Sequence, residues 1–323
     1  MASDNLSEYR IKPELVIVHD PTAFGAFERF PSFAGEKLLN KFLFRDHPCI
    51  EAVQAQHRNF VAELEKRVRV AYLADILLNT HAASYNGHFA VNPNYLFTRD
   101  ALITVPWIPD GYILGRMRKE PRMGEPAVME TVARLLGLWE IVSIPSNLFL
   151  EGGDVIPIVL GGKKVFVMGY GPRTSKETLE FFRRTLVRDG VIDEIIGFEI
   201  APWRLNVDGC FFPLGESIAV AQRDSIVGGV LLGWDYSDEI DPLSHFEQYG
   251  FTVIEVTKEE SYLQQACNFA CLGEGTFIAY NMTERINDAL RARGLEIISV
   301  PGTELVKGNG GPHCMARPVY KAG

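Results

Sequence analysis

The residue with the clearest chemical potential is a cysteine that follows a run of glycines, in the segment GGPHCM at residues 310–315. Glycine has no Cβ, so it lets the backbone approach a ligand closely. A thiolate is a strong nucleophile near neutral pH and forms covalent intermediates at electrophilic carbons. We therefore take Cys314 as the candidate nucleophile.

Three further segments carry carboxylates beside glycines or at the ends of apolar runs: NYLFTRD at residues 94–100, EGGD at 151–154 and NVDGC at 206–210. A guanidinium is planar and cationic, with its donors in a fork, so a site for it needs carboxylates that converge from separate segments. Asp100, Glu151 and Asp208 are the candidates. Without a metal, breaking a C–N bond of a guanidinium requires covalent attack on its central carbon, which Cys314 can provide.

The composition narrows the classes of function. The 323 residues carry a net charge of −9 with no run rich in lysine or arginine, which argues against nucleic acid and suits a small cationic ligand. The five cysteines and seven histidines lack metal-ligand spacing, so we expect free thiols in a reducing compartment, no metal and no cofactor. Charged residues interrupt every apolar window of transmembrane length, and the first ten residues do not resemble a signal peptide. We predict a cytoplasmic globular protein that does not contact a membrane.

The elements that must position these residues follow a repeated order of strand, helix and strand. One unit has strands at residues 15–18 and 70–73 around a helical pattern at 51–68. Two more units have their strands at residues 165–168 and 195–200, and at 277–280 and 297–300, with Thr174 and Glu177 fitting a capping box before the first of their helices. The repetition predicts an α/β protein of sheet-plus-helix modules around a common centre. We expect a flexible end at residues 1–12 and one domain at 13–320.

In their order, the segments FTRD, EGGD, NVD and GPHCM resemble the motifs of arginine deiminases and amidinotransferases, the guanidino-modifying enzymes of pentein fold. The similarity runs from about residue 15 to residue 319. It implies a five-bladed, pseudo-symmetric αβ-propeller with the active site in its central channel. Arginine deiminases also carry a helical insert before the FTRD motif, and this chain has no room for one.

Carried over position by position, the resemblance gives each residue a role. Cys314 corresponds to the nucleophile, Asp100 and Asp208 to the aspartates that bind the guanidinium, and Glu151 to the glutamate that supports the catalytic base. Further substrate-binding positions correspond to Asn94, Arg173 and Asp154.

Two positions depart from the family pattern. Asn206 stands where the family has the histidine of a His-x-Asp motif, and an amide cannot transfer a proton. His313 adjoins the nucleophile, but neighbouring residues of a strand face opposite ways, so we do not expect it to replace that base. Asn309 stands where deiminases that act on free arginine carry an arginine that binds the substrate's α-carboxylate. The substrate of this protein can therefore differ from free arginine. Candidate replacements for that cation are Arg116, Arg118, Lys119 and Lys307.

We therefore predict an enzyme that acts on a small guanidino or amidino compound through a thiouronium-type intermediate on Cys314. Deiminase-like hydrolysis is the leading hypothesis. The alternatives are an amidinotransferase, in which an amine resolves the same adduct, and a pentein that binds its ligand without turnover. A further alternative is that Asn206 is an engineered substitution that traps the substrate. Whether the protein forms a homo-oligomer is left open by the sequence. If residues 206–210 form a strand, Asn206, Asp208 and Cys210 would share one face. We nevertheless interpret Cys210 as a packing residue.

Overall fold

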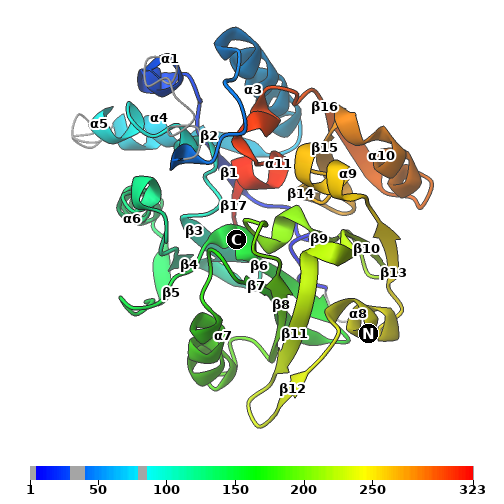
Figure 1. Cartoon of the computed structure of the whole chain (residues 1–323). Coiled ribbons are helices and arrows are strands. Elements are labelled where there is room, and N and C mark those ends of the chain that lie inside the picture. The colour runs from blue at the N-terminus through cyan, green and yellow to red at the C-terminus, as the bar shows by residue number, and fades with distance from the viewer. Residues whose placement is uncertain (1–4, 30–40, 79–85, 323) are drawn as a thin grey trace.

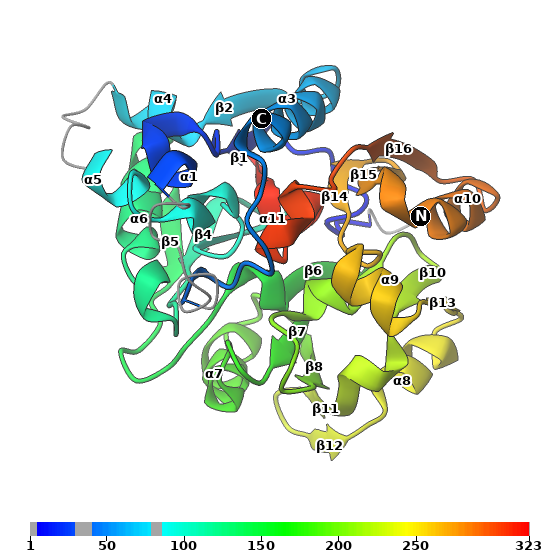
Figure 2. The same ribbon diagram turned by 45° about the horizontal axis from the view of Figure 1, so that its top comes forward.

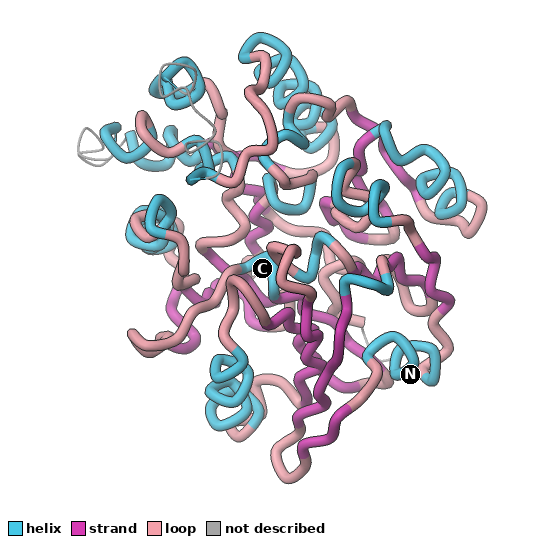
Figure 3. Tube along the Cα trace, viewed as in Figure 1, coloured by secondary structure: helices cyan, strands magenta, loops and turns pink. Residues whose placement is uncertain are grey.

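The computed structural model describes residues 5–29, 41–78 and 86–322. These residues form a mixed α/β structure in which the longer helices lie around the outside of the strands (Figure 1, Figure 3). The short helix α11 (Pro312–Met315) lies near the middle, where segments far apart in the chain meet (Figure 2).

The strands of the described residues form five sheets that share one pairing pattern. In each sheet a middle strand pairs antiparallel with one neighbour, which we call the leading strand, and parallel with the other. In the order leading, middle and third strand, two sheets are β17 (Arg317–Val319), β1 (Leu15–Val18) and β2 (Arg69–Tyr72), and β3 (Leu102–Val105), β4 (Ile108–Leu114) and β5 (Trp139–Val142). Another is β6 (Val155–Leu160), β7 (Lys163–Tyr170) and β8 (Glu194–Ile200), which β11 (Ile226–Leu232) and β12 (Ser237–Glu239) extend beyond β8. The others are β9 (Phe211–Pro213), β10 (Ile218–Ala221) and β13 (Thr252–Glu255), and β14 (Ala270–Gly273), β15 (Thr276–Tyr280) and β16 (Glu296–Val300). The first and last segments of the chain pair in one sheet, as β1 and β17.

A helix links each middle strand to its parallel partner, as a parallel connection requires. These helices are α3 (Ile50–Glu65), α6 (Glu125–Leu135), α7 (Lys176–Phe182) with a π-helical turn at Arg183–Val187, α8 (Pro242–Gln248) and α10 (Glu284–Arg291). Helix α3 buries Val53, Phe60, Val61 and Leu64, which recur on one face of a helix. The remaining helices are short: α1 (Ala26–Arg29), α4 (Leu73–Leu78), α5 (Asn86–Phe89) and α9 (Lys258–Leu263).

The repeated units expected from the sequence are confirmed as the sheets of β1, β7 and β15 with their helices. The capping box expected at Thr174 is wrong. Ser175 is the N-cap of α7, and the Thr174 hydroxyl instead donates to Asp154, whose buried carboxylate needs a donor. A capping box does occur at the start of α9, between Thr257 and Glu260.

The amino-terminal end differs from the flexible segment that we expected over residues 1–12. Ser7, Glu8 and Tyr9 are buried, and Glu8 forms a bidentate ion pair with Arg99 at 2.6 and 2.7 Å. Because neither charge is stable alone in the interior, the pair ties the described part of this segment to the protein.

The turns just before the five leading strands carry the residues of chemical interest. Asp100 precedes β3, Asp154 precedes β6, Asp208 precedes β9, Asn268 precedes β14 and Cys314 precedes β17. Hydrogen bonds join neighbouring turns into a closed ring, from residue 153 to 100, 206 to 154, 268 to 208, 268 to 314 and 99 to 314. The shared sheet pattern thus brings five distant segments to one place.

Candidate active site

Cys314 lies in α11 with only 8% of its surface exposed. Its thiol donates to Asp208 Oδ2 at 3.5 Å, and its sulfur accepts from Asn268 Nδ2 at 3.2 Å. Burial raises the pKa of Cys314 well above its usual value, and the carboxylates of Asp208 and Asp100 raise it further, while the Gly311 backbone and Asn268 oppose the shift. Burial and the two carboxylates thus favour the neutral thiol of Cys314 over its thiolate.

Asp208 and Asp100 approach the cysteine from two other turns. Asp208 lies in a 3₁₀ turn at Val207–Gly209, and its Oδ2 contacts both the thiol and His313 Nδ1, the latter at 2.8 Å. Asp100 accepts from the Gly153 backbone N–H at 3.1 Å through Oδ1. Both aspartates are buried, so an added cation would interact with them strongly.

A residue that the sequence did not single out occupies the other oxygen of Asp100. Arg122 Nη1 donates to Asp100 Oδ2 at 2.7 Å, and the rest of the guanidinium is held by Glu125 at 2.7 and 2.8 Å. Burial opposes the charge of Arg122, but Glu125 and Asp100 outweigh it and raise its pKa well above the usual value. The protein's own guanidinium thus binds one of the aspartates expected to bind a substrate. The spacing of Arg122 and Glu125 predicts their pairing, but nothing in the sequence predicts the contact with Asp100.

Asn206 contacts the carboxylates of the EGGD motif. Its Nδ2 donates to Glu151 Oε2 at 3.3 Å and to Asp154 Oδ2 at 3.1 Å. Glu151 also pairs with Arg173, whose Nε lies 3.0 Å from Oε2. Asp154 is fully buried behind Asn206, and it accepts from Thr174 and from the backbone of residue 207 as well. Burial raises the pKa of Asp154 well above its usual value.

Two small cavities of about 20 Å³ each adjoin Cys314, and each has room for about one water molecule. Leu205, Asn206, Asn309 and Cys314 line both. The first is also lined by Arg204, Asp208, Gly209, Tyr262 and Gln265. The second is also lined by Leu43, Asn94, Phe97, Asp100, Arg122, Arg173, Gly308 and Gly310. Glu151 and Asp154 line neither cavity, so they lie behind the site rather than at its surface.

The second cavity contains unpaired polar atoms. Within the described part of the chain, Asn94 Nδ2 and Arg173 Nη1 are buried donors with no hydrogen-bond partner, and Asn309 Oδ1 is a buried acceptor with none. Asn309 has a left-handed backbone conformation, with φ of 63° and ψ of 25°, which asparagine tolerates well. Buried polar groups that lack a partner are costly, so these three atoms indicate where a ligand would bind.

His313 faces away from both cavities, as we expected, but for a different reason. Residues 312–315 form a helical turn rather than a strand, and the ring lies between Asp208 and Glu8, with Nε2 3.3 Å from Glu8 Oε1. Phe212 packs edge-on against it. The ring therefore supports Asp208 and does not reach a ligand beside Cys314.

Two arrangements that the sequence left open are not found at these cavities. Residues 207–209 form a 3₁₀ turn, so the alternation that would place Cys210 beside Asp208 does not apply, and Cys210 is fully buried and lines neither cavity. The cations considered as replacements at position 309 also line neither cavity. Arg118 and Lys119 are exposed, Arg116 binds the carbonyl of Ser146, and Lys307 binds Glu304.

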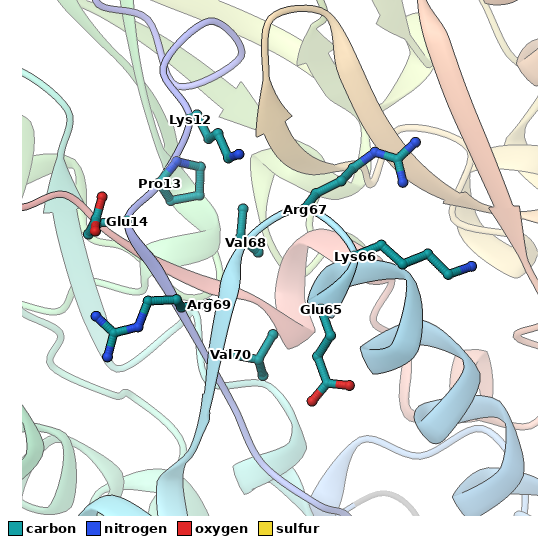
Figure 4. A pocket seen from close by; sticks show the side chains of 9 residues that line it. All are labelled: Lys12, Pro13, Glu14, Glu65, Lys66, Arg67, Val68, Arg69 and Val70. Atoms are coloured by element: carbon teal, nitrogen blue, oxygen red, sulfur yellow. The ribbon is translucent and has the colours of Figure 1, made fainter.

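A larger pocket, of about 790 Å³, contains none of the motif residues (Figure 4). It opens beside the end of α3 and β2, and Lys12, Lys66, Arg67 and Arg69 border it. Two of these cations already pair with carboxylates, Lys66 with Glu63 and Arg67 with Glu296.

Across the described ranges, no cluster of three or more His, Cys, Asp or Glu side chains is arranged to bind a metal ion. None of the described helices combines the length and apolarity needed to span a bilayer.

A model of the arginine deiminase family matches residues 82–208 and 235–321, which together contain the FTRD, EGGD, NVD and GPHCM segments. The chain belongs to the arginine deiminase family. The two matched stretches include Asp100, Asp154, Asp208, Asn268 and Cys314, which lie in the turns of the ring.

Curated and solved relatives agree with this membership. The chain is 22% identical over 308 residues to the arginine deiminase of Staphylococcus haemolyticus, covering 85% of this chain and 72% of that protein. It is 26% identical over 264 residues to the arginine deiminase of Rhodococcus erythropolis, covering 73% of this chain and 63% of that protein. The chain thus spans less than two thirds of the second relative.

Two solved structures share the fold at low identity. The N-terminal domain of ArgZ bound to product, an arginine dihydrolase from the ornithine–ammonia cycle in cyanobacteria, has a TM-score of 0.69 and 15% identity, covering 95% of this chain and 97% of that chain. A dimethylarginine dimethylaminohydrolase adduct with 4-chloro-2-hydroxymethylpyridine has a TM-score of 0.63 and 18% identity, covering 95% and 99%. Both neighbours are members of the pentein superfamily, so the chain has a pentein-like α/β fold.

Proposed function

We propose that this member of the arginine deiminase family is a cysteine-dependent enzyme that hydrolyses a C–N bond of a small guanidino or amidino compound. The observation that carries the proposal is the convergence of Cys314, Asp208 and Asp100 at two adjoining cavities. A nucleophile beside buried carboxylates suits a planar cation whose central carbon is attacked. A related structure, a variant of the ArgZ N-terminal domain, holds a covalently bound reaction intermediate.

We further propose that the five sheets are the blades of a pseudo-symmetric αβ-propeller, with this site in its central channel. The shared pairing pattern of the sheets and the closed ring of hydrogen bonds among their leading turns support this arrangement.

The first chemical step requires a thiolate, which the ligand-free site disfavours. A bound guanidinium would bring positive charge next to Cys314 and the two aspartates, and this charge offsets the effects that raise the pKa of the thiol. Asp208 Oδ2 already accepts the thiol proton in a hydrogen bond, so we assign Asp208 as the group that takes it. The thiolate then attacks the central carbon, and a C–S bond forms.

The proton balance of the reaction closes without a histidine at position 206. The proton released by Cys314 protonates the departing amine as the C–N bond breaks, which leaves a thiouronium-type adduct. Water then attacks the thiouronium carbon and loses both of its protons as the product C=O bond forms. One proton returns to the sulfur as the C–S bond breaks, and the other leaves to solvent, where it protonates the released amine. Asn206 transfers none of these protons, and its hydrogen bonds to Glu151 and Asp154 suit a residue that orients the carboxylates behind the site.

The unpaired atoms of the second cavity indicate the rest of the substrate. Two unpaired donors, on Asn94 and Arg173, favour a ligand that carries a carboxylate or carbonyl oxygen besides its guanidino group. We propose Arg173 as its anchor, because Asn309 supplies no cation. We assign Asp154 a positioning role rather than substrate contact, because all of its hydrogen bonds go to protein groups.

A second candidate function is binding of a guanidino compound without turnover. Two observations favour it: Asn206 cannot act as a base, and Arg122 already occupies Asp100. An experiment must therefore detect chemistry as well as binding.

The test is incubation with a panel of guanidines that differ in their tails: arginine, agmatine, methylated arginines and guanidino acids. Ammonia and amine release are measured, and intact mass spectrometry follows the protein. We expect one panel member to produce an adduct that the Cys314→Ala variant lacks and the Cys49→Ala variant retains, since Cys49 is an exposed free thiol elsewhere.

Binding that survives in Cys314→Ala, with neither adduct nor product from any panel member, would refute the enzymatic proposal and support the binding function. Adding candidate amines distinguishes hydrolysis from amidino transfer, because only transfer yields an amidinated amine.

A further inference from the structure

The turn of the ring that precedes β14 contains Asn268, which no sequence motif indicated. Asn268 directly precedes Phe269 and β14, and 1% of its surface is exposed. Its Oδ1 accepts the backbone N–H groups of His313 at 3.0 Å and Cys314 at 3.3 Å. Its Nδ2 donates to the Asp208 carbonyl at 3.3 Å and to Cys314 Sγ at 3.2 Å. One amide therefore contacts the nucleophile's backbone, its sulfur and the turn of its neighbouring aspartate.

The orientation of this amide is set by its partners. Its oxygen faces two N–H donors and its nitrogen faces a carbonyl oxygen, so exchanging the two would put donors against donors. The nitrogen that points at Cys314 Sγ is therefore a donor. Among the described residues it is the side-chain donor that the sulfur accepts from.

Asn268 and Asp208 have opposite effects on the ionisation of the Cys314 thiol. Asp208 Oδ2 accepts from the thiol, so this contact favours the protonated form and becomes repulsive once the proton has left. The Asn268 N–H donates to the sulfur, and that hydrogen bond strengthens when the sulfur is an anion. Of the two contacts, only the hydrogen bond from the Asn268 amide favours the thiolate, which is the form of Cys314 that attacks.

We propose that Asn268 is the positioning residue of the nucleophile: it fixes the start of α11 so that Cys314 faces the cavities and His313 faces Asp208, and it donates a hydrogen bond to the thiolate. This inference rests on the proposed function of Cys314 and deepens it.

Gly311 is shaped to fit this contact. A Cβ at position 311 would lie 2.5 Å from Asn268 Oδ1 and 2.8 Å from its Cβ, closer than atoms can approach. The backbone of Gly311 is extended, with φ of −120° and ψ of −167°, which alanine can also adopt. A glycine is thus needed at this position for the space that the amide occupies and not for its backbone conformation.

The test measures the ionisation of Cys314 in the ligand-free protein, so it does not depend on a substrate. In a Cys49→Ser background, the rate of alkylation of Cys314 by iodoacetamide is followed against pH by peptide mass spectrometry. The ultraviolet absorbance of the thiolate, taken as the difference from Cys314→Ala, follows the same ionisation without requiring the reagent to enter the cavity.

Asn268→Asp retains the acceptor for the two backbone N–H groups but replaces the donor near the sulfur. We expect the fraction of thiolate at a given pH to fall about tenfold or more, the usual size for a hydrogen bond to a charged group. The matched control is Asn287→Asp, since Asn287 is also a fully buried amide with several hydrogen bonds, but to Tyr280, Thr283 and Ser299. The control should leave the ionisation of Cys314 unchanged.

Gly311→Ala provides a second variant that changes no polar group, in case Asn268→Asp does not fold. It should displace the Asn268 amide and lower the fraction of Cys314 thiolate, as Asn268→Asp does. A folded Asn268→Asp or Gly311→Ala protein whose Cys314 ionises as in the parent would overturn the proposal. The proposed function fails separately, if the parent forms no adduct with any guanidine.

Discussion

Arg122 gives the sharpest prediction, because it competes for the carboxylate that a substrate guanidinium would need. Its Nη1 holds Asp100 Oδ2 at 2.7 Å, and Glu125 holds the rest of its head group. If this contact must break before a ligand can use Asp100, removing Arg122 should tighten the binding of guanidines. The change should also keep the number of buried carboxylates left without a cation as small as possible.

The single variant Arg122→Gln is less informative than a double variant that also changes Glu125. It leaves Asp100 and Glu125 buried without their cation, and breaking a buried pair in this way costs about 3–5 kcal/mol of unfolding free energy. The double variant Arg122→Gln/Glu125→Gln removes one positive and one negative charge, so the local net charge stays the same. We expect it to unfold at a higher temperature than the single variant.

The expected gain in affinity follows from the contact that is removed. A hydrogen bond to a charged group is worth about 1.5–3 kcal/mol, which corresponds to about 10- to 150-fold in the dissociation constant. The measurement is isothermal titration calorimetry with guanidinium, agmatine and arginine on a Cys314→Ala background, which prevents turnover. The control is Arg134→Gln/Glu130→Gln, which removes an exposed ion pair from the same helix as Glu125.

A double variant that binds these ligands no more tightly than its parent, while the control is also unchanged, would refute the competition. Weaker binding would show instead that Arg122 holds Asp100 in the geometry that the ligand requires.

Three further predictions test other parts of the site. Asn206→His should raise turnover by about 100-fold or more if a general base is what the site lacks; steady-state rates measure this, and a fall would assign asparagine a role of its own. Arg173→Lys should raise KM for guanidino acids far more than for agmatine, which has no carboxylate; equal effects on both would contradict the anchor role. Burial opposes ionisation of Glu8, but Arg99 and His313 outweigh it and lower its pKa. Glu8 therefore stabilises the fold above its unfolded pKa of about 4.3, and this contribution is lost as pH falls towards the folded pKa. The difference in unfolding free energy between the parent and Glu8→Gln should shrink in acid, and a constant difference would contradict this account.

Much of the fold follows from the sequence. The apolar runs at residues 15–18, 165–168 and 277–280 are strands, and the helical patterns that follow them are helices. These signals are readable because burial imposes a period on the side chains of each element. The short turns are less readable: residues 206–210 and 312–315 were treated as strands, but hydrogen bonds to distant turns hold them in helical conformations.

Residue types and motif spacing along the chain predict the chemical groups of the candidate site: Cys314, Asp100 and Asp208, all of which line a cavity. The partners of these groups are set by the folded structure. It placed Arg122 on Asp100, and Asn268 against the nucleophile. These contacts join segments 22 and 46 residues apart. The motifs are local and can be read along the chain, whereas the charge and hydrogen bonding of the site depend on which turns the sheets bring together.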